Sequence, residues 1–182
     1  MFRTTASIAL LGALCARAAV AAPAPRALAF PAPTAALSAG IRADLARPGA
    51  SAPEARFLNL VNAERMRRGL PTVAWDPTLC SAARQHSEEM ARLGYFDHSS
   101  PVAGLESPAD RWEQCVADPP PSYTIAENLF YGSVPDVSWG HRSLMHSEAH
   151  RENILNPEFT RAGIGVYVAG DGEMWVTEMF VG

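Results

Sequence analysis

The clearest structural signal in this sequence is an amphipathic helix between Asp76 and Gly94. Asp76 is a suitable N-cap, Pro77 suits the first helical position, and Gly94 suits the position after the last turn. Between them, Leu79, Ala83, His86, Met90 and Leu93 recur at steps of three and four residues. This spacing places them on one side of a helix, so one face of the helix is predicted to belong to a core.

The rest of the C-terminal region favours further helices and a small sheet. Helices are predicted over 53–68, 107–115 and 135–147, and a short strand over 72–75. Near the C-terminus, AGIGVYVA and MWVTEMFV are joined by GDGE, whose Asp-Gly step is typical of a hairpin. These elements predict one α+β domain over residues 53–182, most simply a sheet covered by helices.

The first 52 residues are predicted to lie outside this domain. Residues 1–22 combine Arg3, a short apolar run and small residues in an A-x-A pattern, which is typical of a cleaved secretory signal peptide. The apolar run is too short for a membrane span, and the residues before Cys15 fit a lipidation signal poorly. Residues 23–52 are rich in Ala and Pro and predict a flexible linker. We therefore expect a secreted or cell-envelope protein with no transmembrane segment after cleavage.

The charge of the chain argues against one class of partner. Removal of residues 1–22 takes away Arg3 and Arg17, which changes the formal net charge from −4 to −6. Nucleic-acid binding depends on a basic surface that neutralises phosphates. No nucleic-acid partner is therefore expected.

Two cysteines remain after the signal peptide, Cys80 and Cys115. An even number of cysteines in an exported protein favours a disulfide, because oxidation persists outside the cytoplasm. A Cys80–Cys115 disulfide is predicted, and two buried thiols are the alternative.

Several motifs in their order along the chain resemble one known family. They are LNLVNAERMRRGLPTVAWDPTLCSAARQHSEEMA, YFDHSSP, AENL, SEAHRENILNPEFTRAGIGV and WVTEMFVG. Over residues 54–182 the chain resembles a bacterial member of the CAP superfamily, also called the SCP-like extracellular domain. The resemblance implies a three-layer α-β-α sandwich with a small antiparallel sheet between helices, and a cleft lined by histidines and acidic residues.

The same resemblance assigns candidate cleft residues. His98 matches the family histidine after the second helix, Glu127 matches the glutamate of a G-E-N motif, and His150 matches the histidine of a G-H-R-x-N-I-L motif. The sequence departs from these motifs at Ala126 and Ala149, where the family has glycine. The fourth cleft residue is left open between Glu148, Glu152 and Glu178, the last of which stands where glutamine is common.

Imidazole and carboxylate groups are suitable ligands for zinc or another divalent metal, and a catalytic zinc typically has three protein ligands and an open position. His98, Glu127 and His150 have that composition. HSEAH over 146–150 does not match the zincin motif, because its Glu is in the middle of the pair of histidines. His86 is predicted to be a hydrogen-bonded core histidine, whereas His141 and His146 are predicted to be exposed.

The leading hypothesis for function is a secreted domain whose cleft binds a divalent metal or a small ligand, such as a lipid or a glycan, without strong catalytic activity. The first alternative is a metal-assisted hydrolase that uses the same residues. The second is a module that interacts with the cell envelope or another cell-surface component. The sequence does not decide whether the protein is an enzyme.

Overall fold

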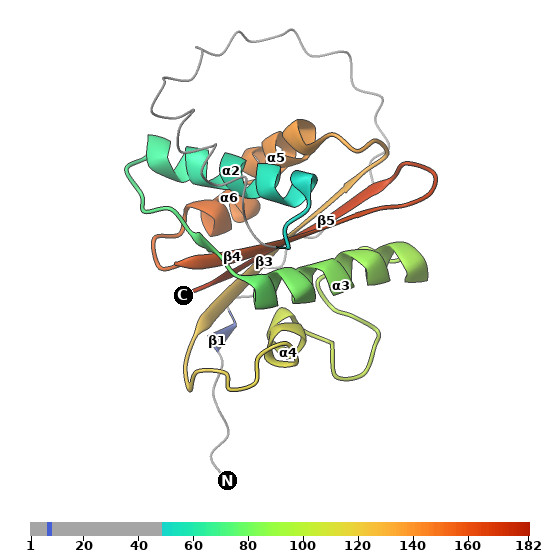
Figure 1. The fold of residues 1–182 in the computed structure, drawn as a ribbon, viewed down its shortest axis with the longest axis horizontal. Helices are drawn as coiled ribbons and strands as arrows, with labels where there is room; N and C mark the ends of the chain where they lie inside the picture. The colour runs from blue at the N-terminus through green and yellow to red at the C-terminus, as the bar shows by residue number, and fades with distance from the viewer. Residues whose placement is uncertain (1–6, 9–48) are drawn as a thin grey trace, which may run out of the picture.

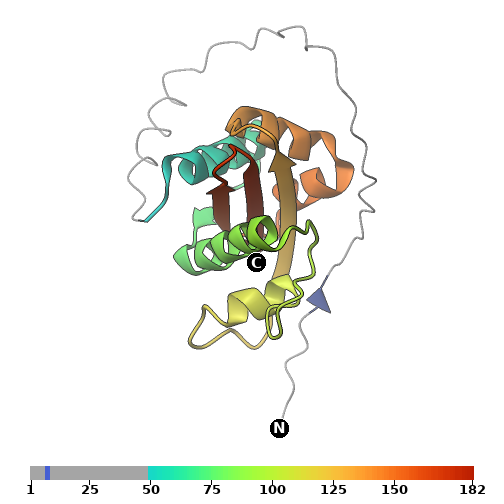
Figure 2. The same cartoon turned by 90° about the vertical axis from the view of Figure 1, so that its right-hand side faces the viewer.

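The computed structural model describes residues 7–8 and 49–182, and the domain has three layers (Figure 1). One face of the sheet is covered by α2 (Ala52–Arg67), α5 (Val137–His146) and α6 (Glu148–Leu155), and the other face by α3 (Pro77–Leu93) and α4 (Pro108–Glu113). Figure 2 shows the same layers from the side, with β3 running between the two groups of helices. The predicted three-layer α-β-α sandwich is confirmed.

The sheet between the helices has the strand order β1-β3-β5-β4-β2. Its strands are β1 (Ser7–Ile8), β2 (Ala74–Trp75), β3 (Thr124–Gly132), β4 (Arg161–Val168) and β5 (Met174–Val181). β5 lies between β3 and β4 and is antiparallel to both, whereas β1 and β2 pair in parallel at the two edges. The predicted C-terminal hairpin is confirmed as β4 and β5, but β3 and α6 were not among the predicted elements.

The predicted helix over 76–94 is confirmed as α3, with the expected ends. The Asp76 carboxylate accepts hydrogen bonds from the Thr78 and Leu79 amides, and Gly94 adopts a left-handed conformation with φ of 71°. The helix lies very close to β4, because a Cβ atom at Gly163 or Gly165 would come within 2.2 Å of α3 backbone atoms. These two glycines therefore determine how closely the α3 layer approaches the sheet.

Before α2, the structure describes residues 7–8 and 49–51. Ser51 caps α2 through a capping box with Glu54, so the helix begins one residue before the predicted boundary at residue 53. Apart from β1, the predicted signal peptide (1–22) lies outside the described residues, as does most of the predicted linker (23–52), and both stay predictions. Among the described residues, no helix is long and apolar enough to cross a membrane.

The predicted disulfide is not formed, and both cysteines are free thiols. The Cys80 thiol is buried under α3 and donates a hydrogen bond to the Ile164 carbonyl of β4 at 3.1 Å. Burial raises the pKa of this thiol to about 12. Cys115 follows α4 and is only partly buried. The disulfide prediction is wrong for this structure because the Cys80 side chain is directed at β4 and has its hydrogen-bond partner there.

Candidate functional site

Two polar residues in the middle of β3 point to opposite sides of the sheet. Successive side chains on a strand alternate between faces. Glu127 pairs across the sheet with Met179, and its contacts lie on the side of α3 and α4. Asn128 pairs with Glu178, and its contacts lie on the side of α6. β3 thus carries two separate polar networks, one in each interface between the sheet and the helices.

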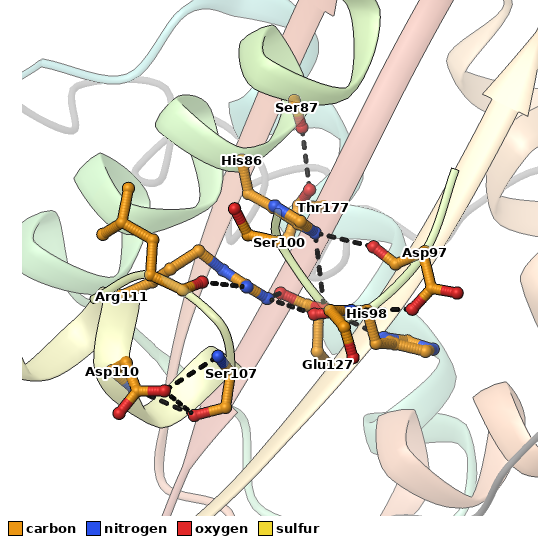
Figure 3. A network of polar contacts seen from close by, with 12 residues as sticks. His86, Ser87, Asp97, His98, Ser100, Ser107, Asp110, Arg111, Glu127 and Thr177 are labelled. Atoms are coloured by element: carbon orange, nitrogen blue, oxygen red, sulfur yellow. Dashed lines mark hydrogen bonds and ion pairs between the residues drawn. The ribbon is translucent and has the colours of Figure 1, made fainter. Parts of the chain in front are cut away.

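Glu127 lies at the centre of a compact cluster of charged groups, which we call the Glu127 cluster: Glu127, His98, Arg111 and His86 (Figure 3). The Arg111 Nη2 atom donates to Glu127 Oε2 at 2.7 Å, and His98 Nδ1 lies 2.9 Å from Glu127 Oε1. Burial alone would raise the pKa of Glu127, but the hydrogen bond from His98 and the charge of Arg111 hold that pKa below its usual value. Glu127 is therefore an ionised carboxylate with both oxygens in use.

The loop that carries His98 is held against α3 by several side chains. His86 Nε2 lies 3.0 Å from the Asp97 carbonyl oxygen, and the Glu89 carboxylate accepts hydrogen bonds from the hydroxyls of Tyr95 and Ser100. Burial lowers the pKa of His86, which is fully buried. His86 is therefore the buried, hydrogen-bonded histidine that the sequence predicted, and it contributes to the site by fixing the loop.

His150 approaches the site from the other layer of helices. It lies on α6, and its main-chain carbonyl accepts a hydrogen bond from Asn128 Nδ2 at 3.1 Å. Burial lowers the pKa of its half-buried imidazole, and the charge of His98 lowers it further. The two imidazoles are thus close enough to interact electrostatically. The structure brings His98 into contact with Glu127 and places His150 within electrostatic range of His98.

The candidates for a fourth member of the site do not join the Glu127 cluster. Glu178 lies on the opposite face of the sheet from Glu127, and Glu148 and Glu152 are exposed on α6. Within residues 49–182, no group of three or more His, Cys, Asp or Glu side chains could hold a metal ion. The predicted three-ligand arrangement of His98, Glu127 and His150 is therefore not found, because Glu127 is occupied by Arg111 and His98.

Glu178 forms the centre of the second polar network. Its side chain is fully buried, and Oε2 accepts a hydrogen bond from Asn128 Nδ2 at 3.1 Å. Its Oε1 atom has no hydrogen-bond partner among the described residues. Burial raises the pKa of Glu178 to about 7, and the hydrogen bond from Asn128 offsets only part of the loss of hydration. Asn128 Oδ1 also accepts from Asn153 Nδ2 at 2.9 Å, so this network ties α6, and with it His150, to the sheet.

The structure corrects one prediction about histidines and reveals a residue that sequence reasoning missed. His141 was expected to be exposed, but it is buried in the α2 and α5 layer, and burial lowers its pKa to about 4. His146 is exposed as predicted.

The residue that the sequence did not point to is Arg111, which follows Asp110 in a helix that the sequence did predict. In the sequence, Arg111 is a charged residue next to Trp112 on a short helix, and this pattern does not indicate burial.

The sandwich, with Glu127 on β3 in contact with His98, defines this protein as an SCP-like domain. The model of the Cysteine-rich secretory protein family, CAP, matches residues 58–180, and the chain belongs to that family.

The chain is also similar to individual members. It is 41% identical over 134 residues to YkwD, an uncharacterized protein of Bacillus subtilis (strain 168), and the match covers 72% of this chain and 48% of YkwD. It therefore spans about half the length of that relative.

Two solved structures share the fold. The first, an extracellular protein with an SCP domain from Bacillus anthracis str. Ames, is 31% identical with a TM-score of 0.61, over 71% of this chain and 40% of that chain. The second, NaASP2 with Zn2+, is 14% identical with a TM-score of 0.52, over 73% of this chain and 81% of that chain. At this low identity, the second comparison shows the fold alone.

Proposed function

We propose that this domain is a secreted binding protein in which the imidazoles of His98 and His150 together bind a divalent metal or a small polar ligand. The observation that carries the proposal is the hydrogen bond of 2.9 Å between His98 Nδ1 and Glu127 Oε1. An ionised carboxylate can only accept, so Nδ1 carries a proton, and in the neutral form of the imidazole Nε2 then keeps its lone pair. A free ring nitrogen of this kind is what a metal or a hydrogen-bond donor requires.

His150 supplies the second nitrogen. Its lowered pKa keeps the imidazole neutral at pH 7, and a neutral imidazole is the form that binds metals. The charge of His98 contributes to this effect, so the two rings are within electrostatic range of each other. Two imidazole nitrogens from different layers of the fold are the donor set that the geometry supports.

The same geometry defines the role of Glu127. It does not fit as a metal ligand, because Arg111 occupies Oε2 and His98 occupies Oε1. A carboxylate that accepts from the far nitrogen of a metal-binding histidine is, however, a frequent partner that fixes the ring and raises its basicity. Bound between His98 and His150, a zinc ion would supply an electrophilic centre for oxygen or nitrogen groups of a small ligand. That NaASP2 was solved with Zn2+ on the same fold is consistent with this proposal.

The hydrolase alternative gains no support from the site. A water-activating base must lie within hydrogen-bonding reach of the proton that it removes. Glu127 is buried, has a lowered pKa, and has both oxygens committed to Arg111 and His98.

The proposal of secretion rests on the predicted signal peptide and on the likeness to an extracellular SCP-domain protein. A lipid, a glycan or another cell-surface component stays open as the natural ligand.

Calorimetric titration of zinc into the metal-stripped protein at neutral pH tests the proposal. The variants are His98→Ala and His150→Ala, and the matched control is His146→Ala, since His146 is an exposed histidine four residues before His150. Binding of one zinc ion per chain is expected in the parent and in the control, with loss in both test variants. Binding that survives in either test variant would refute a shared site, and the absence of zinc binding in the parent would refute metal binding.

A further inference from the structure

Arg111 is the least expected member of the Glu127 cluster, because it is a fully buried cation that the sequence motifs do not include. It lies on α4, whose first turn is fixed by a capping box between Ser107 and Asp110 (Figure 3). Its guanidinium donates from Nη1 to the Leu105 carbonyl at 2.9 Å and from Nη2 to the His98 carbonyl at 3.0 Å and to Glu127 Oε2 at 2.7 Å. The acceptors lie on the loop before α4 and on β3.

These contacts hold His98 at two places. One hydrogen bond reaches the main-chain carbonyl of His98, which positions its backbone. The other reaches Glu127, whose second oxygen accepts from the His98 ring. A planar guanidinium presents several donors in fixed directions, which an ammonium group cannot reproduce. Arg111 therefore connects the position of the loop with the orientation of the ring.

We propose that Arg111 is a positioning residue that keeps His98 in the tautomer with hydrogen on Nδ1, so that Nε2 faces the binding site. The inference rests on the proposed function, since it explains how one of the two nitrogen donors is oriented. The Arg111 Nη2 atom binds both the His98 carbonyl and Glu127 Oε2, which leaves Glu127 Oε1 as the acceptor for His98 Nδ1. Without the guanidinium, the His98 main chain and the Glu127 carboxylate lose their shared donor, so the Glu127 side chain is no longer held in the position that orients the His98 ring.

The chain contains a second buried arginine, and its replacement distinguishes an effect on the orientation of His98 from a general effect on the fold. Arg65 is also fully buried, and it donates to the carbonyls of Pro71, Ile154, Asn156 and Phe159 at 2.7 to 3.0 Å. No carboxylate is among these acceptors. Replacement of Arg65 should therefore destabilise the fold through lost loop contacts, as replacement of Arg111 does, but should leave the ring of His98 unchanged.

The experiment compares Arg111→Lys with Arg65→Lys by long-range ¹H–¹⁵N correlation NMR of the histidine rings, without metal. In the parent and in Arg65→Lys, His98 is expected to show only the tautomer with hydrogen on Nδ1. In Arg111→Lys, both tautomers are expected, and the affinity for zinc should fall by about tenfold, as when other groups that orient a metal-binding histidine are lost. A single Nδ1 tautomer in Arg111→Lys would overturn the proposal, as would mixed tautomers in Arg65→Lys.

If Arg111→Lys does not fold, the double variant Arg111→Met with Glu127→Gln removes both charges together. A neutral amide can donate as well as accept, so the His98 ring is expected to populate both tautomers. A ring that stays in the Nδ1 tautomer in this variant would also overturn the proposal. Because the tautomer is read without metal, its result is independent of zinc binding. Failure of the proposed function would instead be seen as unchanged zinc binding in His98→Ala.

Discussion

Glu127 and Glu178 are both buried carboxyl groups in the central sheet, and their surroundings give them opposite properties. They lie on neighbouring strands but on opposite faces, because Glu178 pairs with Asn128, the residue after Glu127. Glu127 has a guanidinium and an imidazole as partners, and its pKa is lowered. Glu178 has only the amide of Asn128, and its pKa is raised to about 7. Burial alone would raise both values, so the charge of the partner decides the difference.

The comparison also separates two roles. An ionised carboxylate with a fixed counter-ion can orient a histidine at any pH near neutrality, which suits Glu127. Glu178 is in part protonated at pH 7 and links β5 through Asn128 to α6, the helix that carries His150. The resemblance to the family places glutamine at this position, and a neutral side chain there would not titrate. Three predictions test this contrast, and a fourth concerns the two cysteines.

The largest effect is expected from removal of the counter-ion of Glu127. Arg111→Met leaves a buried carboxylate without its cation, which should cost about 3–5 kcal/mol in the free energy of unfolding. Adding Glu127→Gln should restore much of this loss, since the buried charge is then gone. Urea denaturation at pH 7 measures both variants. A loss no larger than about 1 kcal/mol in Arg111→Met would show that the ion pair does not stabilise the fold.

The next effect concerns Glu178 and depends on pH. Its folded pKa is raised, so the folded state favours the protonated acid, and stability should fall as pH rises from about 4.5 to about 7 and then level off. The difference between about 7 and the ordinary value of 4.5 corresponds to about 3 kcal/mol at alkaline pH. Glu178→Gln should therefore be more stable than the parent at pH 8.5 and similar to it at pH 4.5.

Denaturation of the two proteins at both pH values tests this expectation. Asp97→Asn is a suitable control, because Asp97 is an exposed carboxylate in the same domain. Equal stability of Glu178→Gln and the parent at pH 8.5 would mean that Glu178 titrates normally and that burial does not disfavour its charge.

Glu127 should show the opposite pH dependence. Its folded pKa is lowered, so its contribution is present above about pH 4.5 and is lost as pH falls through the folded pKa. Glu127→Gln should lose about 2 kcal/mol at pH 7, where Arg111 and His98 lack their carboxylate partner. The difference from the parent should shrink at pH 3. Thermal unfolding at both pH values checks this, and a difference that grew toward acid pH would contradict a lowered pKa.

The smallest effect is expected from reduction. Cys80 and Cys115 are free thiols in the structure, so addition of dithiothreitol should leave the midpoint of thermal unfolding unchanged. A native disulfide typically contributes about 2–5 kcal/mol to a small domain. A clear fall in the midpoint after reduction would show that the cysteines are joined in the protein in solution, in agreement with the sequence prediction.

The sequence predicted those parts of the fold whose signals are local. α3 has its cap at Asp76, its proline at the first position and its terminal glycine, and each acts within one helical turn. The β4 and β5 hairpin has its turn chemistry between two apolar runs. The motif residues His98, Glu127 and His150 were identified from the resemblance to the family, and the structure brings two of them into contact and the third close by.

The missed strand β3 shows the limit of local signals. Glu127 and Asn128 lie in its interior, and adjacent polar residues do not have the pattern of a buried strand. They are accommodated there because Arg111, His98, Asn153 and Glu178 supply partners from distant parts of the chain. His141 was misjudged for a similar reason, since its burial depends on how α5 packs on α2.

By itself, the sequence determined where four of the helices, α2 to α5, and the hairpin form, because caps, turns and the spacing of apolar residues act over a few neighbouring residues. Only the tertiary structure decided the electrostatics of the site. The charge state of a buried group depends on which side chains surround it, and Glu127 and Glu178 look alike in the sequence. Arg111 lies beside Glu127, which is therefore an ionised anchor for His98. Glu178 has the amide of Asn128 as its partner, and it titrates near neutral pH.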